Sequence, residues 1–181
     1  MFAEIRSNQG LRFGITFLVL FLLFYYFNLF FIGITGEGGM FYSAFLDRHL
    51  NYIRWLRLAL LYICSGLLEL FGYETIIYPT RLKLVGGVSV GLVYTCLAYG
   101  VMSFYAAFII AWPKPFRDKW KMLLGGLLVI NILNVLRICA VLLVYSYYSR
   151  KGGIDIDHHL IFNIIVYVII SVMIYRWINK K

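Results

Sequence analysis

Charged side chains are scarce in this chain. Only 14% of its 181 residues are Asp, Glu, Lys or Arg, whereas 62% are hydrophobic. Soluble domains carry about a quarter charged residues, so the composition excludes an ordinary soluble protein. Apolar runs of about 20 residues, the length that crosses a bilayer, recur along the chain. The sequence therefore predicts an integral membrane protein.

Cysteines and histidines are few as well, with three of each. All three cysteines, Cys64, Cys96 and Cys139, fall within apolar runs. They therefore indicate neither a disulfide framework nor zinc-type spacing, and no metal or cofactor is expected. Most Lys and Arg behind the net charge of +9 lie in short turns and do not alternate with exposed aromatics. Nucleic acid is therefore not an expected partner.

We expect a single integral membrane domain over residues 1–181, built as an all-α polytopic fold with about five transmembrane helices. Those helices are predicted near residues 13–32, 54–72, 91–112, 122–146 and 160–178. Residues 73–90 are rich in Thr, Val, Ile and Tyr and include Pro79 and two adjacent glycines. This composition predicts a short β-hairpin or extended loop, on the extracytoplasmic side.

Positive charge predicts the side of the membrane that each loop faces. The turn at 113–121 and the C-terminal tail are both rich in Lys and Arg, so both are expected in the cytoplasm. Arg54 and Arg57 are then expected at the cytoplasmic edge. The N-terminus fits this rule less well, and an interfacial amphipathic helix over residues 40–57 would change the count of spans.

Tryptophans mark the membrane interface, and three of them stand at the predicted cytoplasmic ends of the last three helices: Trp112, Trp120 and Trp177. A helix rising 1.5 Å per residue puts Cys96, Arg137 and the pair His158 and His159 roughly 24–29 Å above these markers. The hydrocarbon core is about 30 Å thick. All four residues are therefore predicted in one layer of the outer leaflet.

A thiol, an imidazole and a guanidinium at one level suit acyl transfer. A neighbouring His or Arg favours the nucleophilic thiolate, and histidine can carry its proton to a leaving amine. A cation such as Arg137 stabilises an oxyanion strongly in a low dielectric. Asn134, three residues before Arg137 in the apolar stretch "NILNVLRICAVLLV" (131–144), is expected to orient it.

Other functions stay open on these residues alone. A lone cysteine in a membrane helix is most often a small packing residue. Arg137 could be a structural anchor in a non-enzymatic transport or assembly subunit. The same thiol could also serve a lipid-modifying acyltransferase.

Three stretches resemble the exosortase/archaeosortase family of membrane cysteine transpeptidases, and most closely its small Bacteroidetes-type branches. They are "TCLAYGVMSFYAAFIIAWP" (95–113), "NILNVLRI" (131–138) and "DHHLIFNIIVY" (157–167). In that family a Cys opens one span, an N-x-x-R-I motif lies in the next, and a His begins the following one. Order and spacing agree over residues 72–177.

The resemblance implies a cysteine peptidase and transpeptidase in the bacterial cytoplasmic (inner) membrane, with its active site towards the extracytoplasmic side. Such an enzyme cleaves a C-terminal sorting signal, which is a short motif, a transmembrane helix and a basic tail, from exported proteins. The acyl group then passes to an envelope lipid or polymer acceptor. By position, Cys96 is the implied nucleophile, Arg137 the oxyanion or thiolate stabiliser, and a histidine the proton carrier.

Two positions depart from the family pattern. Many members have Cys-Ser-Gly-Leu at the nucleophile, but here that string stands at residues 64–67 and Cys96 is followed by Leu-Ala-Tyr. Cys64 lies only about 14 Å above Trp55 along a helix, near the midplane, so we interpret it as a decoy. The family has an aromatic residue four positions after its histidine. Phe162 matches that position when His158 is the base, which favours His158. His159 shares a helical face with Asn163 and is the alternative base.

Overall fold

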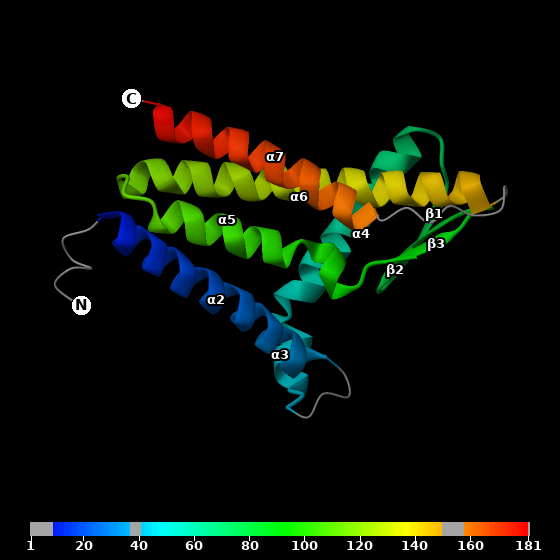
Figure 1. Ribbon diagram of the computed structural model, residues 1–181. Coiled ribbons are helices and arrows are strands. Elements are labelled where there is room, and N and C mark those ends of the chain that lie inside the picture. Colours follow the sequence, from blue (N-terminus) through cyan, green and yellow to red (C-terminus); the bar gives the residue numbers. More distant parts are fainter. Residues whose placement is uncertain (1–8, 37–40, 150–157, 181) are drawn as a thin grey trace. The chain divides into compact units, whose positions relative to one another are not determined.

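The computed structural model describes residues 9–36, 41–149 and 158–180. Helices dominate these residues, with one small antiparallel sheet (Figure 1). The predicted fold class, a helical polytopic membrane protein with a short hairpin, is confirmed. The elements in chain order are α2 (Gln9–Thr35), α3 (Ala44–Leu50), α4 (Tyr52–Leu70), β1 (Thr75–Tyr78), β2 (Arg81–Leu84), β3 (Ser89–Gly91), the 3₁₀ helix η1 (Tyr94–Leu97), α5 (Tyr99–Ala111), α6 (Phe116–Ser149) and α7 (His158–Asn179).

Within the described residues, four helical segments are long and apolar enough to cross a membrane: Gln9–Thr35, Tyr94–Ala111, Phe116–Tyr148 and Leu160–Asn179. The span predicted at 54–72 is also helical and corresponds to α4. It does not belong to these four segments, and it carries Arg54, Arg57 and Glu69. The chain is therefore a multi-pass membrane protein.

The chain forms two compact units, Met1–Asn51 with Tyr99–Val129, and Tyr52–Ala98 with Ile130–Lys181. In the first unit, α2 packs along α5 through a ladder of phenylalanines. The Phe17 and Phe104 rings meet edge to face at 5.3 Å, and the Phe13 and Phe108 rings do the same at 5.3 Å. Such edge-to-face pairs suit a membrane interior because their attraction does not depend on water.

The same unit brings α5 very close to the first half of α6. Tyr105 is fully buried, and its hydroxyl donates to the Met122 carbonyl at 2.6 Å. A Cβ atom at Gly126 would overlap the Tyr105 ring, whereas a Cβ at the neighbouring Gly125 would meet nothing within 4 Å. Gly126 therefore leaves room for the tyrosine, the role that small residues play in membrane helix packing.

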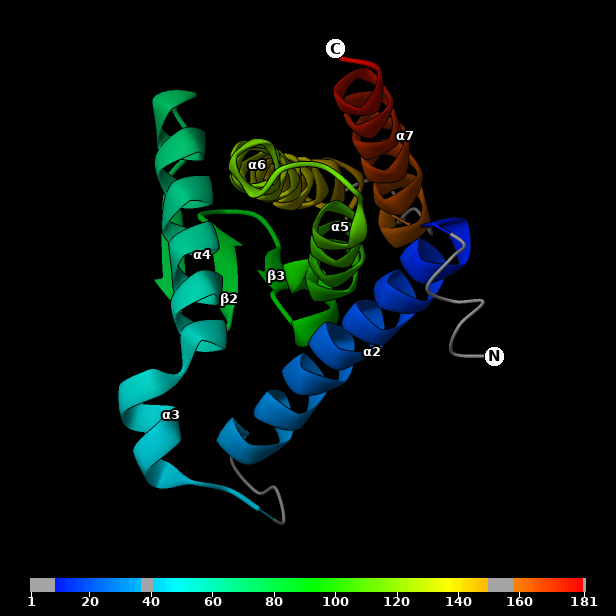
Figure 2. The same cartoon turned by 90° about the vertical axis from the view of Figure 1, so that its left-hand side faces the viewer.

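The second unit contains the sheet, with strand order β1-β2-β3 and antiparallel pairing throughout. Residues along β2 alternate: Leu82 and Leu84 are buried, while Arg81 and Lys83 are exposed. Helix α4 lies against β1 and β2 (Figure 2). The predicted hairpin at 73–90 is thus confirmed, and a third strand, which the sequence did not suggest, extends it to Gly91.

Substitution of Gly126 tests the close approach of α5 and α6. We expect Gly126→Ala to lower the thermal stability of the purified protein in detergent, because overpacking costs about 1–3 kcal/mol. The matched variant Gly125→Ala should be neutral or slightly stabilising, since alanine is the better helix former. Equal melting temperatures for the two variants would contradict the packing described here.

Candidate active site

Cys96 lies in a break between strand and helix. The segment predicted as one helix from residue 91 is instead β3, the 3₁₀ turn η1 and then α5, which begins at Tyr99. The prediction of a continuous helix there was wrong because Ala98 adopts a left-handed conformation, with φ of 57°, that ends the turn. Non-glycine residues pay about 1–2 kcal/mol for this geometry, which makes Ala98 a strained position two residues after the cysteine.

Two side chains of α6 hold the backbone at Cys96. Asn134 Nδ2 donates to the Cys96 carbonyl oxygen at 2.9 Å, and Arg137 Nη2 donates to the same oxygen at 3.2 Å. Asn134 is fully buried and Cys96 is only 7% exposed. The structure therefore brings together three of the residues that the sequence singled out, Cys96, Asn134 and Arg137.

Arg137 is half-buried, and no carboxylate pairs with it among the residues that the structure describes. Its guanidinium carbon lies 4.4 Å from the centre of the Phe162 ring of α7. A guanidinium has five N–H donors, of which the bond to Cys96 O uses one. The remaining donors and the positive charge make it suited to an anionic group beside the thiol.

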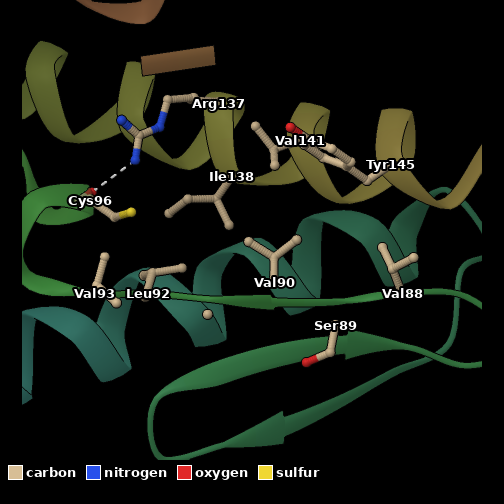
Figure 3. A pocket seen from close by; sticks show the side chains of 11 residues that line it. Val88, Ser89, Val90, Leu92, Val93, Cys96, Arg137, Ile138, Val141 and Tyr145 are labelled. Atoms are coloured by element: carbon tan, nitrogen blue, oxygen red, sulfur yellow. Dashed lines mark hydrogen bonds between the residues drawn. The ribbon is translucent and has the colours of Figure 1, made fainter. Parts of the chain in front are cut away.

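A pocket of about 450 Å³ opens between α6 and residues 88–93. Cys96 and Arg137 lie together at one end of it, and Ile138, Val141 and Tyr145 continue the α6 wall (Figure 3). Cys96 is the cysteine that lines this pocket. A backbone segment bound along β3 would therefore end beside a thiol and a cation.

A second, apolar groove of about 380 Å³ lies between α6 and α7. It shares Arg137, Val141 and Tyr145 with the Cys96 pocket. The rest of its lining is almost entirely hydrophobic, with residues such as Leu133 and Ile165. Arg137 thus lies where the Cys96 pocket and the apolar groove meet.

The end of the hairpin is fixed to α6 by Ser146, a residue that the sequence did not single out. Its Oγ accepts from the Val88 amide at 3.2 Å. A Cβ atom at Gly87 would come within 2.7 Å of the same Oγ, so the adjacent glycine permits the approach. The two glycines at 86–87 predicted the turn, but nothing in the sequence indicated its partner.

Cys64 and Cys139 lie together, away from the pocket lining. Cys139 Sγ donates to the Cys64 carbonyl oxygen at 3.8 Å, and both residues are buried. Cys139 is two residues after Arg137, so the depth argument that set Cys64 far below Arg137 was wrong. Cys64 does not line the pocket that contains Cys96.

Arg57 also lies elsewhere than predicted. Its guanidinium carbon is 4.8 Å from the centre of the Tyr94 ring, and Tyr94 opens the turn that contains Cys96. The expectation that Arg57 and Cys96 mark opposite edges of the membrane was therefore wrong. The charge rule failed because Arg57 contributes to a cavity instead of flanking a span.

The side chains of His158 and His159 lie outside the described residues. From Leu160 onwards, α7 buries one residue in every four, namely Phe162, Val166, Ile170 and Ile174. Asn163 is exposed. The described residues contain no group of three His, Cys, Asp or Glu side chains that could hold a metal ion.

A known family matches most of the chain. The sequence model of the family described as transmembrane exosortase matches residues 38–176. No curated protein and no solved structure matches the chain.

Ala98 offers a test of the strained turn after Cys96. We expect Ala98→Gly to raise the stability of the detergent-purified protein by about 1 kcal/mol, because glycine adopts positive φ without penalty. Ala106→Gly, in the middle of α5, should lower the stability by a similar amount. Thermal unfolding of both variants checks the pair, and a loss of stability in Ala98→Gly would contradict the left-handed turn.

Proposed function

The chain belongs to the exosortase family of membrane proteins, and on this premise we propose that it is a cysteine peptidase and transpeptidase acting at the outer face of the bacterial cytoplasmic membrane. Its substrates are exported proteins that end in a sorting signal of a short motif, a transmembrane helix and a basic tail. The observation that carries the proposal is that Cys96 and Arg137 lie together at one end of a pocket, with Asn134 bonded to the Cys96 carbonyl oxygen behind them.

In this mechanism the histidine takes the proton of the Cys96 thiol, and the resulting thiolate attacks the carbonyl carbon of the scissile peptide bond. The tetrahedral intermediate collapses as the C–N bond breaks, leaving a thioester on Cys96 and an amine that takes a proton from the histidine. The nucleophile of an envelope lipid or polymer then attacks the thioester and gives its proton to the histidine. The C–S bond breaks, and the Cys96 thiolate is restored.

Arg137 is the proposed stabiliser of the negative charge that forms on the thiolate and on the carbonyl oxygen. Its position beside Cys96 supports this role, because a fixed cation in a low-dielectric site needs no reorganisation when charge develops. Asn134 is a positioning residue, since its bond to Cys96 O holds the turn that carries the thiol.

His158 is the proposed proton carrier. Helical periodicity puts position 158 on the same face as Phe162, whose ring lies against the Arg137 guanidinium. The exposed Asn163 lies four residues after His159, so the same periodicity directs position 159 towards the exposed face. These relations favour His158 over His159.

The apolar groove between α6 and α7 is the proposed site for the helix of the sorting signal. An apolar helix needs an apolar surface, and the groove shares Arg137 with the pocket that contains Cys96. A helix in the groove would therefore lead an extended motif at its end towards the thiol. This arrangement suits a substrate that is part lipid-embedded and part extended.

Loss of the thiol or of the planar guanidinium should stop processing. We expect Cys96→Ala to abolish cleavage of an exported protein bearing such a signal, and Arg137→Lys to reduce it at least ~100-fold, because lysine lacks the fork geometry. Both variants should accumulate in the membrane, and immunoblots of precursor and product measure the effect. Cys64→Ala, the control, should process normally.

Unchanged processing by Cys96→Ala would instead favour a non-enzymatic transport or assembly subunit in which Arg137 is an anchor. Mass spectrometry of the species trapped on Cys96 separates the two enzymatic alternatives. A peptide acyl group is expected for the transpeptidase, and a fatty acyl group would indicate a lipid-modifying acyltransferase.

The positioning role of Asn134 predicts a split in the kinetic constants. Asn134→Ala should lower kcat about tenfold, the effect of losing one hydrogen bond of roughly 1.4 kcal/mol, and leave KM almost unchanged. Asn131→Ala, one turn earlier in α6, is the control and should keep kcat. A rise in KM with constant kcat for Asn134→Ala would show that the residue binds substrate instead.

A further inference from the structure

A third cavity, of about 490 Å³, lies beside the pocket that contains Cys96. The two spaces share four lining residues, Ser89, Gly91, Leu92 and Val93. The polar side chains of the cavity come from four places in the chain: Arg57 from α4, Thr80 and Arg81 from the β1–β2 turn and β2, Ser89 from β3, and Tyr94 from η1.

Arg57 is held in place instead of extending freely into solvent. Its guanidinium stacks against the Tyr94 ring, with 4.8 Å between the guanidinium carbon and the ring centre. Its Nε is buried and has no hydrogen-bond partner among the described residues. A buried N–H of a cation without an acceptor is costly, so the atom's surroundings are incomplete without an acceptor group.

Arg81 reaches the same cavity from the next element. It pairs with Gly91 across the β2–β3 ladder, which brings its strand position beside the cavity wall. No acidic residue lines the cavity, and no carboxylate pairs with Arg57 or Arg81 within the part of the chain that the structure describes. The lining therefore carries two uncompensated positive charges.

The arrangement of donors distinguishes between classes of anion. A carboxylate has two coplanar oxygens, which a single guanidinium fork can satisfy. A phosphoryl group presents oxygens in several directions, and it suits guanidinium and hydroxyl donors that converge from different elements. Two arginines together with the hydroxyls of Thr80, Ser89 and Tyr94 fit the second case.

We propose that this cavity binds a phosphoryl group, carried by a lipid headgroup or by free phosphate, next to the site of Cys96. Arg57 and Arg81 supply the charge, and the three hydroxyls supply further donors. The proposal concerns binding alone, so it stands whether or not Cys96 acts as a nucleophile.

Binding of soluble probes to the purified full-length protein in detergent tests the proposal. The probes are dihexanoyl phosphatidylglycerol, inorganic phosphate, acetate and uncharged dihexanoylglycerol. We expect the phospholipid to bind, and Arg57→Gln and Arg81→Gln each to raise its Kd at least tenfold, since a charge-assisted bond to each arginine is lost. Arg54→Gln on the same helix and Lys83→Gln on the same strand remove equal charge outside the cavity and should leave Kd unchanged.

The remaining probes identify the source of the anion. Binding of inorganic phosphate with the same dependence on Arg57 and Arg81 would support a phosphoryl site open to free phosphate, and binding of the phospholipid alone would support a lipid headgroup. Acetate binding as tight as phosphate, uncharged dihexanoylglycerol binding as tight as the phospholipid, or equal losses in the Arg54 and Lys83 controls would overturn the proposal. So would the absence of binding by both phosphorus-containing probes. Cys96→Ala should retain the probe binding, which keeps this result separate from any failure of processing.

Discussion

The free-energy cost of burying an unpaired guanidinium in an apolar helix determines how the candidate site is built. Arg137 and Asn134 lie in a stretch of α6 that is otherwise almost wholly hydrophobic, and each needs a hydrogen-bond partner there. Both find it in one atom, the carbonyl oxygen of Cys96. That oxygen belongs to the segment between β3 and α5, where the backbone is not α-helical, so it also needs a hydrogen-bond donor. The same contact therefore supplies acceptors for the two side chains and donors for the backbone carbonyl.

The sheet follows from the same constraint. Buried backbone N–H and C=O groups outside helices must find hydrogen-bond partners elsewhere in the protein or in water. Residues 75–91 satisfy theirs by pairing as three strands, by the bond of Val88 to Ser146, and by the bond of Leu92 to the Thr80 carbonyl. The strand nearest α6 then becomes one wall of the pocket, so the element that solves a hydrogen-bonding problem also defines the space beside the thiol.

Periodic and compositional features were predictable from the sequence. Long apolar runs predicted the helices, and a run of β-branched residues with Pro79 and paired glycines predicted the hairpin. Helix rise measured against the tryptophans predicted that Cys96 and Arg137 lie at one level, and Asn134 was expected to orient Arg137. That estimate gave the right neighbours although Cys96 precedes its helix, because a short break changes the rise by only a few ångströms.

The features that could not be predicted depend on which way a helix faces and on which residues, distant in the sequence, it contacts. Helix rise gives a height along one axis and says nothing of where a helix faces, so it misjudged Cys64 on α4. The charge rule misplaced Arg57 on the same helix. That helix lies against the sheet and brings Arg57 beside Tyr94 and Cys64 beside Cys139. The charge rule treats every arginine near a span as a marker of the cytoplasmic edge. An arginine whose Nε is buried and whose guanidinium stacks on an aromatic ring has a local role, and only the fold can distinguish the two.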